Sequence, residues 1–298
     1  MFAVGVDIGG TAIKAGLVEI ESGRILDRHT VPFPKGEGSA AVWDRAEACI
    51  QQLLRFRQPA RKALGAIGVA IPGSLDPSRT HVIHAYNLDF HSAEVRRPLE
   101  ERFPGISLQI LNDGDAAALA EHRFGALKGT KTAALVTLGT GVGGGLILNG
   151  KLFGGGLGNG VEIGHMTLNW AGPSHHCGNS GCVEMYCAAS ALAPESSSMS
   201  PRDAIDRIRS GDPKMSDILD RYTDALSGAL ASIVNLLDPE AIALGGGASN
   251  AGEALLIPLR EKVYRKAFFE TECRIVQAAM GNEAGIVGAA ISHVCASQ

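Results

Sequence analysis

The chain has 298 residues, more than a single hydrophobic core usually supports, so we expect one large domain or two smaller lobes. Its hydrophobic fraction of 45% and charged fraction of 19% are ordinary for a globular protein, and a net charge of −4 gives no long-range attraction for nucleic acid or anionic lipid. No basic leader and no apolar run of about 18 residues occurs, so we expect neither a signal peptide nor a membrane span.

The first residues predict two strands joined by a glycine turn. Apolar residues alternate with small ones over residues 2–8, and a second strand-like run covers 12–18 after Gly9-Gly10. A third strand is expected over about 25–31. In nucleotide-binding P-loops and dinucleotide folds the glycine loop opens a helix, so a glycine turn between two strands excludes both.

The remaining elements alternate between strands and helices. In the first half we expect a helix over 40–57, a strand over 66–71, a helix over 93–103, a strand over 108–111 and a helix over 116–124. The second half repeats the opening design, with strands 133–138 and 143–148 around a glycine loop, and Asn149-Gly150 as a hairpin turn. A helix over 222–237, a strand over 241–244 and a last helix from about 284 follow. No linker divides the chain, so two similar lobes sharing a cleft is the simplest architecture.

The glycine loops suggest phosphate binding. In DIGGTAIK, the backbone N–H groups of Gly9 and Gly10 could converge on an anion, with Thr11 and Lys14 as further donors and Asp7 placed to hold a hydrated Mg²⁺. The alternative reading is a tight hairpin. Two further clusters, Gly139-Thr140-Gly141 and Gly245-Gly246-Gly247, favour a triphosphate bound between lobes.

A carboxylate follows the strand at 108–111. Asp113 stands where a strand ends and a helix begins, and a carboxylate there could accept the proton of a hydroxyl that attacks a γ-phosphoryl group. The alternative is a helix N-cap, for which Asn112, Asp113 and Asp115 are all available.

Five motifs in this order resemble the ROK sugar kinases of the actin/hexokinase-like superfamily, over nearly the whole chain. DIGGTAIK and LGTGVGGGLILNGKLFGG resemble the two phosphate motifs, LNDGDAAALAE the catalytic segment, EIGH a sugar motif, and HHCGNSGCVE the zinc motif CxCGxxGCxE. The resemblance implies an α/β fold of two actin-like (ribonuclease H-like) lobes with the nucleotide and sugar in a cleft between them. We place the N-terminal lobe at 1–112, completed by the C-terminal helix 284–298, and the C-terminal lobe, with its zinc-binding loop, at 113–283.

The resemblance also implies an ATP- and Mg²⁺-dependent kinase that phosphorylates the 6-hydroxyl of a hexose, with Asp113 as general base. It places sugar contacts on the following residues: Asn87, Asn112, Asp113, Glu162, His165 and Glu184. The short span between EIGH and the cysteines, and Asn87-Leu88, favour glucose, with N-acetylmannosamine, N-acetylglucosamine, allose and fructose as alternatives. Asp115 departs from the family, which usually has Asn there; we favour a capping role for it over an electrostatic one.

The zinc motif departs from the family at its first ligand. The resemblance implies a structural zinc held by His165, Cys177 and Cys182, and its first cysteine position falls on His175. Imidazole and thiolate both suit zinc, so we expect a Cys2His2 set, with His176 as the alternative. A nucleic-acid finger would need two separated ligand pairs and a basic helix, which this segment lacks.

Other function classes are a sugar-sensing repressor and an inactive sugar-binding protein. Repressors of this fold carry a DNA-binding module before the first strand, whereas here a strand is expected from residue 2; an intact Asp113 argues against an inactive protein. Six cysteines without a secretion signal fit a reducing compartment, so we expect a cytoplasmic enzyme. The resemblance suggests a homodimer, with a tetramer as the alternative.

Overall fold

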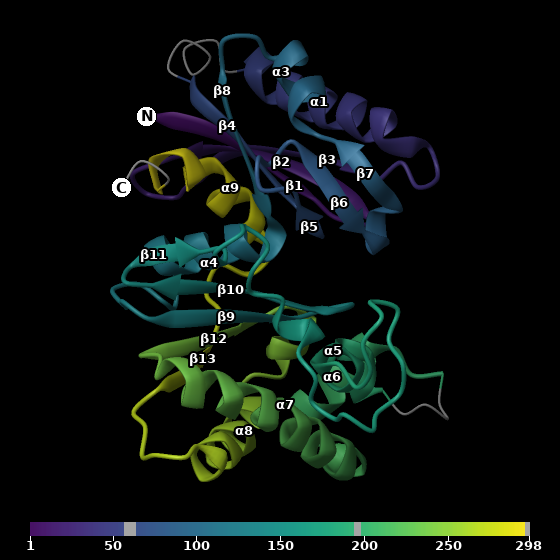
Figure 1. The fold of residues 1–298 in the computed structure, drawn as a ribbon, viewed down its shortest axis with the longest axis vertical. Coiled ribbons are helices and arrows are strands. Elements are labelled where there is room, and N and C mark those ends of the chain that lie inside the picture. Colours follow the sequence, from purple (N-terminus) through teal and green to yellow (C-terminus); the bar gives the residue numbers. More distant parts are fainter. Residues whose placement is uncertain (57–63, 194–197, 296–298) are drawn as a thin grey trace. The chain divides into compact units, whose positions relative to one another are not determined.

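The computed structural model describes residues 1–56, 64–193 and 198–295 (Figure 1). The chain forms two compact units. The first contains Met1–Gly125, Lys151–Gly160 and the residues from Asn282 onward, and the second contains Ala126–Gly150 and Val161–Gly281. No helix in the described part of the chain is long and apolar enough to cross a membrane.

The first unit is built on a five-stranded sheet of order β3-β2-β1-β4-β8. Its strands are β1 (Phe2–Ile8), β2 (Ala12–Glu19), β3 (Ile25–Pro32), β4 (Leu64–Ile71) and β8 (Ser107–Asn112). The first three, each predicted as a strand, form an antiparallel meander with Val4 opposite Leu17, and β4 and β8 add in parallel. The carboxyl ends of β1, β4 and β8 therefore meet at one edge of the sheet.

Helices cover both faces of this sheet. Helix α1 (Gly38–Phe56) packs through Trp43 against the face that carries Val4 and Val6, whereas α9 (Ala284–Cys295) packs on the face that carries Ala3. The α9 backbone lies so close that a Cβ at Gly68 would come within 1.8 Å of the Ala289 carbonyl oxygen. Glycines in the strands thus allow a helix to rest directly on the sheet.

The boundary of the first unit differs from the predicted one at 112. Helix α4 (Asp113–Phe124) stays in the first unit because it packs on α9, where a Cβ at Gly288 would meet the Ala116 carbonyl oxygen at 1.7 Å. Residues 151–160 also return to this unit, with β11 (Lys151–Phe153) following the Asn149-Gly150 turn. The last residues of the predicted helix, 296–298, lie outside the described residues.

A small antiparallel sheet in the first unit was not predicted. It consists of β5 (Ser74–Leu75), β6 (His81–Ala85) and β7 (Phe90–Glu94), and the short 3-10 helix η1 (Tyr86–Leu88) connects its last two strands. Helix α3 (Arg96–Arg102) is shorter than the predicted 93–103 because β7 occupies the first of those residues. This small sheet determines where Asn87 lies.

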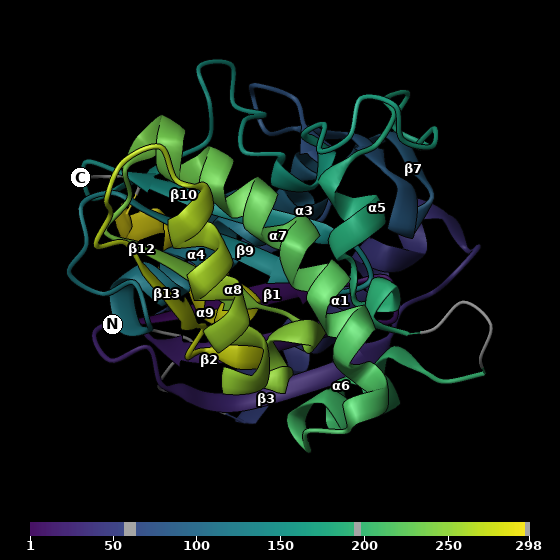
Figure 2. The same cartoon turned by 90° about the horizontal axis from the view of Figure 1, so that it is seen from below.

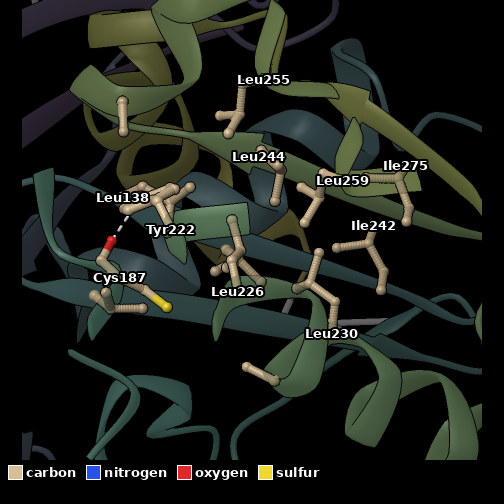
Figure 3. Packing of buried hydrophobic residues seen from close by; sticks show 14 of the residues in the cluster. Leu138, Cys187, Tyr222, Leu226, Leu230, Ile242, Leu244, Leu255, Leu259 and Ile275 are labelled. Atoms are coloured by element: carbon tan, nitrogen blue, oxygen red, sulfur yellow. Dashed lines mark hydrogen bonds between the residues drawn. The ribbon is translucent and has the colours of Figure 1, made fainter. Parts of the chain in front are cut away.

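The second unit contains a sheet with the strand order β10-β9-β12-β13, formed by β9 (Ala133–Leu138), β10 (Val142–Leu148), β12 (Ala241–Gly245) and β13 (Arg274–Gln277). Figure 2 shows α7 (Ser216–Leu237) and α8 (Glu253–Lys266) lying across one face of it. Leu226 and Leu230 of α7 and Leu259 of α8 pack with Ile242 in a buried core (Figure 3). Two shorter helices, α5 (Val183–Cys187) and α6 (Pro201–Arg209), complete the unit.

Candidate functional site

The first glycine turn joins β1 to β2 as predicted. It is closed by a hydrogen bond from the Gly9 N–H to the Ala12 carbonyl oxygen (2.9 Å), and Thr11 is exposed at its tip. A Cβ at Gly10 would lie 3.0 Å from the Asn87 carbonyl oxygen. Glycine at position 10 therefore lets the η1 segment approach the turn closely, which brings a predicted sugar residue next to a predicted phosphate loop.

Asp7 ends β1 beside the same turn. Its Oδ2 lies 3.4 Å from Nζ of Lys14 on β2, and a Cβ at Gly285 would lie 2.9 Å from the Asp7 carboxyl carbon. Desolvation raises the pKa of Asp7, and the charge and hydrogen bond of Lys14 oppose that rise. The predicted magnesium ligand and the predicted phosphate lysine thus form an ion pair with each other.

The strand-to-helix junction at Asn112 is held by its amide side chain. Oδ1 of Asn112 accepts from the N–H groups of Gly114 (2.7 Å) and Asp115 (3.3 Å), and Nδ2 donates to the Gly73 carbonyl oxygen (3.1 Å). Asn112 is therefore the N-cap of α4. The capping role that we favoured for Asp115 is wrong: this residue is buried in the first turn, and its own N–H is what Asn112 caps.

Asp113, the predicted base, is the first residue of α4 and is exposed. Its Oδ1 accepts from the Gly114 N–H at 2.9 Å. The junction thus presents an exposed carboxylate whose backbone is held in place by a half-buried cap.

The second glycine loop, residues 139–141, joins β9 to β10 in the second unit. The Gly139 N–H donates to the Gly141 carbonyl oxygen at 2.9 Å, and the carbonyl oxygen of Gly139 accepts from the Ala189 N–H at the same distance. Thr140 lies exposed between these two glycines. The loop is thus a closed turn whose middle residue is open to solvent.

The third cluster, Gly245 to Gly247, follows β12. Gly246 has φ of 78°, and a Cβ there would lie 2.5 Å from the Leu138 carbonyl oxygen, so only glycine fits. Gly247 is exposed, with open space where a Cβ would be, and it starts the 3-10 helix η5 (Gly247–Ala251). The turn therefore leads directly into a helical segment at the end of a central strand.

Glu184 on α5 is held through both oxygens of its carboxylate. Its Oε2 accepts from the Val142 N–H at 2.8 Å and would be only 2.2 Å from a Cβ at Gly141. Its Oε1 lies 3.1 Å from Nε2 of His175. One carboxylate thus joins the second glycine loop to the predicted zinc segment.

Glu162 precedes the short 3-10 helix η2 (Ile163–His165) in the same unit, and His165 is its last residue. Desolvation raises the pKa of Glu162; the charge of His165 lowers it, and the charge of Glu184 raises it further. The two carboxylates and the histidine are therefore close enough to influence one another, as a shared polyol site requires.

Four predicted zinc ligands come together. Each of His165, His175, Cys177 and Cys182 offers a ligand atom, and these atoms all lie within 4.8 Å of one another. Two distances are short, with 3.0 Å between His175 Nδ1 and Cys177 Sγ and 3.6 Å between the two Sγ atoms. Two sulfurs bound to one tetrahedral zinc are about 3.8 Å apart, so this spacing fits that metal.

The histidines of this segment add two further observations. Nδ1 of His165 is buried without a hydrogen-bond partner among the described residues, as expected of an atom meant to bind a metal. The alternative ligand His176 groups instead with His175 and Glu184, and it is exposed. The donor set of two imidazoles and two thiols therefore suits zinc.

The local backbone explains why these residues converge. Gly178 and Gly181 have φ of 89° and 61°, and a Cβ at Gly181 would lie 1.7 Å from the Asn169 carbonyl oxygen. Asn179 Nδ2 donates to the His165 carbonyl oxygen at 3.2 Å, which draws the two halves of the segment together. The neighbouring Cys187 is buried outside the cluster, and burial raises the pKa of its thiol to about 12.

Two backbone groups at the site were missed by sequence reasoning. The Val142 N–H binds Glu184 and the Gly73 carbonyl oxygen binds Asn112, across 42 and 39 residues of sequence. No local pattern announces such long-range partners. The only sequence signal is glycine: Gly73 itself supplies one of the two groups, and Gly141 directly precedes Val142, which supplies the other.

Comparison with known proteins finds relatives that match nearly the whole chain. The ROK family model matches residues 3–293. A glucokinase of Streptomyces coelicolor is 33% identical, covering 96% of this chain and 96% of its own. A ROK family glucokinase from Streptomyces griseus, solved in complex with glucose and AMPPNP, is 32% identical, with a TM-score of 0.84, and covers 97% of this chain and 98% of its own.

A ROK hexokinase from Thermus thermophilus is 34% identical, also with a TM-score of 0.84, and covers 98% of this chain and 97% of its own. These structural matches confirm the predicted actin-like α/β fold class. On the evidence of the family model and of relatives above 30% identity, the chain belongs to the ROK family.

Proposed function

We propose that this protein transfers the γ-phosphoryl group of ATP to the 6-hydroxyl of a hexose, with glucose as the first candidate. The carrying observation is the exposed carboxylate of Asp113 at the start of α4, held in position by the Asn112 cap. The glucokinase names of relatives above 30% identity over nearly the whole chain support the choice of reaction and of sugar.

Asp113 acts as the general base. It accepts the proton of the sugar 6-hydroxyl while that oxygen forms a bond to the γ-phosphorus and the bond from phosphorus to the β–γ bridging oxygen breaks. ADP leaves, and the proton stays on Asp113 until solvent takes it. This chemistry needs a correctly placed carboxylate more than a shifted pKa, because phosphoryl transfer depends mainly on positioning.

The sugar is held by neutral and acidic hydrogen-bonding groups. The family resemblance assigns these contacts to Asn87, Asn112, Glu162, His165 and Glu184. Carboxylates accept hydrogen bonds from sugar hydroxyls, and a site built to hydrogen-bond a hydroxyl rejects analogues that lack it. Discrimination among hexoses therefore depends on these few side chains.

The glycine loops are proposed to hold the phosphates of ATP through backbone N–H groups: Gly9, Gly10 and Thr11, Gly139 to Gly141, and Gly245 to Gly247. Asp7 would hold Mg²⁺, which neutralises phosphate charge, and its ion-pair partner Lys14 would add a positive charge for the same phosphates. His165, His175, Cys177 and Cys182 would hold a structural zinc that stiffens the sugar-binding segment.

An assay of ADP release with a panel of hexoses tests the proposal. We expect the highest kcat/KM with glucose, and lower values with N-acetylmannosamine, N-acetylglucosamine, allose and fructose. A higher value with another of these sugars would change the substrate, and no sugar-dependent ADP release at all would overturn the kinase. A homodimer or tetramer, on family resemblance, and a cytoplasmic location, on the cysteine content, remain part of the same proposal.

A further inference from the structure

A chain of contacts leads from the zinc cluster to the second glycine loop through two side chains. His175 Nδ1 lies 3.0 Å from Cys177 Sγ, inside the cluster, and His175 Nε2 lies 3.1 Å from Glu184 Oε1, outside it. Glu184 Oε2 then accepts from the Val142 N–H at 2.8 Å. All of these residues belong to the second unit.

The two ring nitrogens of His175 face different partners: Nδ1 faces Cys177, and Nε2 faces Glu184. A nitrogen that binds a metal must be unprotonated, so a histidine that ligates through Nδ1 carries its proton on Nε2. That proton points to Glu184, and a metal-bound histidine that donates to a carboxylate is a recurring arrangement that fixes both the tautomer and the ring orientation. The His175 side chain is 8% exposed, so solvent competes little for this hydrogen bond.

A cysteine at this position would have no such effect. Its thiolate could bind zinc, but it offers no second donor group and ends short of Glu184. The departure from the CxCGxxGCxE pattern therefore exchanges one ligand for another and adds a hydrogen bond to a proposed sugar-binding carboxylate.

We propose that His175 is a positioning residue that orients the Glu184 carboxylate for the sugar, so that sugar affinity depends on which ligand stands at position 175. This inference rests on the proposed function, because it assumes that the cluster binds zinc and that Glu184 binds the sugar. With one oxygen held by His175 and the other by Val142, the carboxylate cannot rotate, and its unused lone pairs face fixed directions.

The packing at Gly141 strengthens this constraint. Because Glu184 Oε2 would be 2.2 Å from a Cβ at that position, the carboxylate sits directly against the backbone of the loop. A carboxylate supported on both sides loses little entropy when the sugar binds, whereas one with a single support retains alternative rotamers. Removing the His175 donor should therefore weaken sugar binding while leaving the chemical step nearly intact.

The decisive variant is His175→Cys, which restores the four-ligand pattern of the family motif but removes the imidazole donor. Ser174→Cys is the matched control, because it adds a thiol at the adjacent exposed position and keeps His175. For both variants and the wild type we would measure zinc content by mass spectrometry, the Kd for glucose by calorimetry without ATP, and kcat and KM.

We expect His175→Cys to retain one zinc per chain, with kcat nearly unchanged and the Kd and KM for glucose raised about tenfold, in the range of losses for outer partners of a metal site. In a double-mutant cycle with Glu184→Gln, the two effects should be less than additive. A zinc-loaded His175→Cys protein with wild-type glucose affinity would overturn the inference. Wild-type protein that binds no zinc or no glucose would instead overturn the proposed function.

A second measurement tests the same inference if His175→Cys does not bind zinc. Long-range ¹H–¹⁵N spectra of the zinc-loaded wild type distinguish the two ring nitrogens of a histidine. We expect His175 to bind zinc through Nδ1 and to show a slowly exchanging Nε2 proton that shifts in Glu184→Gln. Ligation through Nε2, or a proton signal that Glu184→Gln leaves unchanged, would overturn the inference.

Discussion

The Nε2 atom of His175 lies 3.1 Å from the Oε1 atom of Glu184, so a proposed zinc ligand and a proposed sugar ligand share one hydrogen bond. The two residues are nine positions apart, and the turns at Gly178 and Gly181 bring them together. The segment proposed to bind zinc and the carboxylate proposed to bind sugar are thus directly connected.

The choice between His175 and His176 as zinc ligand leads to a clear prediction. His175 faces Cys177 and its side chain is largely shielded from solvent, whereas His176 is exposed, so His175→Ala should lose most of its zinc and His176→Ala should keep it. Metal analysis of the purified proteins checks this, with Cys295→Ser as a control for a thiol outside the cluster. Undiminished zinc in His175→Ala would move the ligand to His176 or elsewhere.

Gly141→Ala should displace Glu184. The new Cβ would lie 2.2 Å from Glu184 Oε2, and relieving such a clash costs about 1–3 kcal/mol, so we expect glucose affinity to fall about tenfold or more. Gly156→Ala is the matched control, because no atom lies within 4 Å of its Cβ position. If calorimetry gives Gly141→Ala the same Kd for glucose as Gly156→Ala, then glucose binding does not depend on the present position of Glu184.

Asp76 should make stability depend on pH in acid. Desolvation pushes its pKa upward, but hydrogen bonds from the His81 and Thr80 N–H groups and from the Ser78 and Thr80 hydroxyls outweigh this and hold the pKa well below its usual value. A carboxyl with a lowered pKa stabilises the folded state above its unfolded pKa of about 3.9, and this stabilisation is lost as the pH falls below that value.

Asp76→Asn should therefore lower the free energy of unfolding by about 1 kcal/mol at pH 7, with solvent screening included. The difference from wild type should shrink as the pH falls below about 4. Urea titrations at several pH values measure it. A difference that stays constant into acid would mean that the charge of Asp76 contributes nothing to this turn.

The sequence alone was sufficient for the elements with regular patterns. Alternating apolar residues predicted β1 and β2, and the glycine turn between two strands excluded the folds in which such a turn opens a helix. The small sheet was missed because β6 reads His81-Val82-Ile83-His84, where polar and apolar residues come in pairs and do not alternate. Helix α6 was also missed, although Ser200 and Pro201 form a recognisable start signal.

In the site, too, residues that share a short motif were predicted, and contacts between distant residues were not. Each motif carries its residues within a short stretch, so the grouping of His165, His175, Cys177 and Cys182 followed from the motif pattern, and the structure places these four together. The role of Asp115 was predicted wrongly because three polar residues competed for one cap, and only the backbone geometry selects Asn112. The Glu184 contacts depend on tertiary packing, which no local pattern encodes.

The proposed phosphoryl transfer depends most directly on Asp113 as the general base. Asp113→Asn keeps the size of the side chain and an oxygen that can accept from the Gly114 N–H, but it cannot take a proton from the sugar. We would measure kcat by ADP release and glucose binding by calorimetry on the same preparation. We predict a fall in kcat of about 10²–10⁴-fold with unchanged glucose affinity, the usual loss for a general base. Turnover close to that of the wild type would contradict the account.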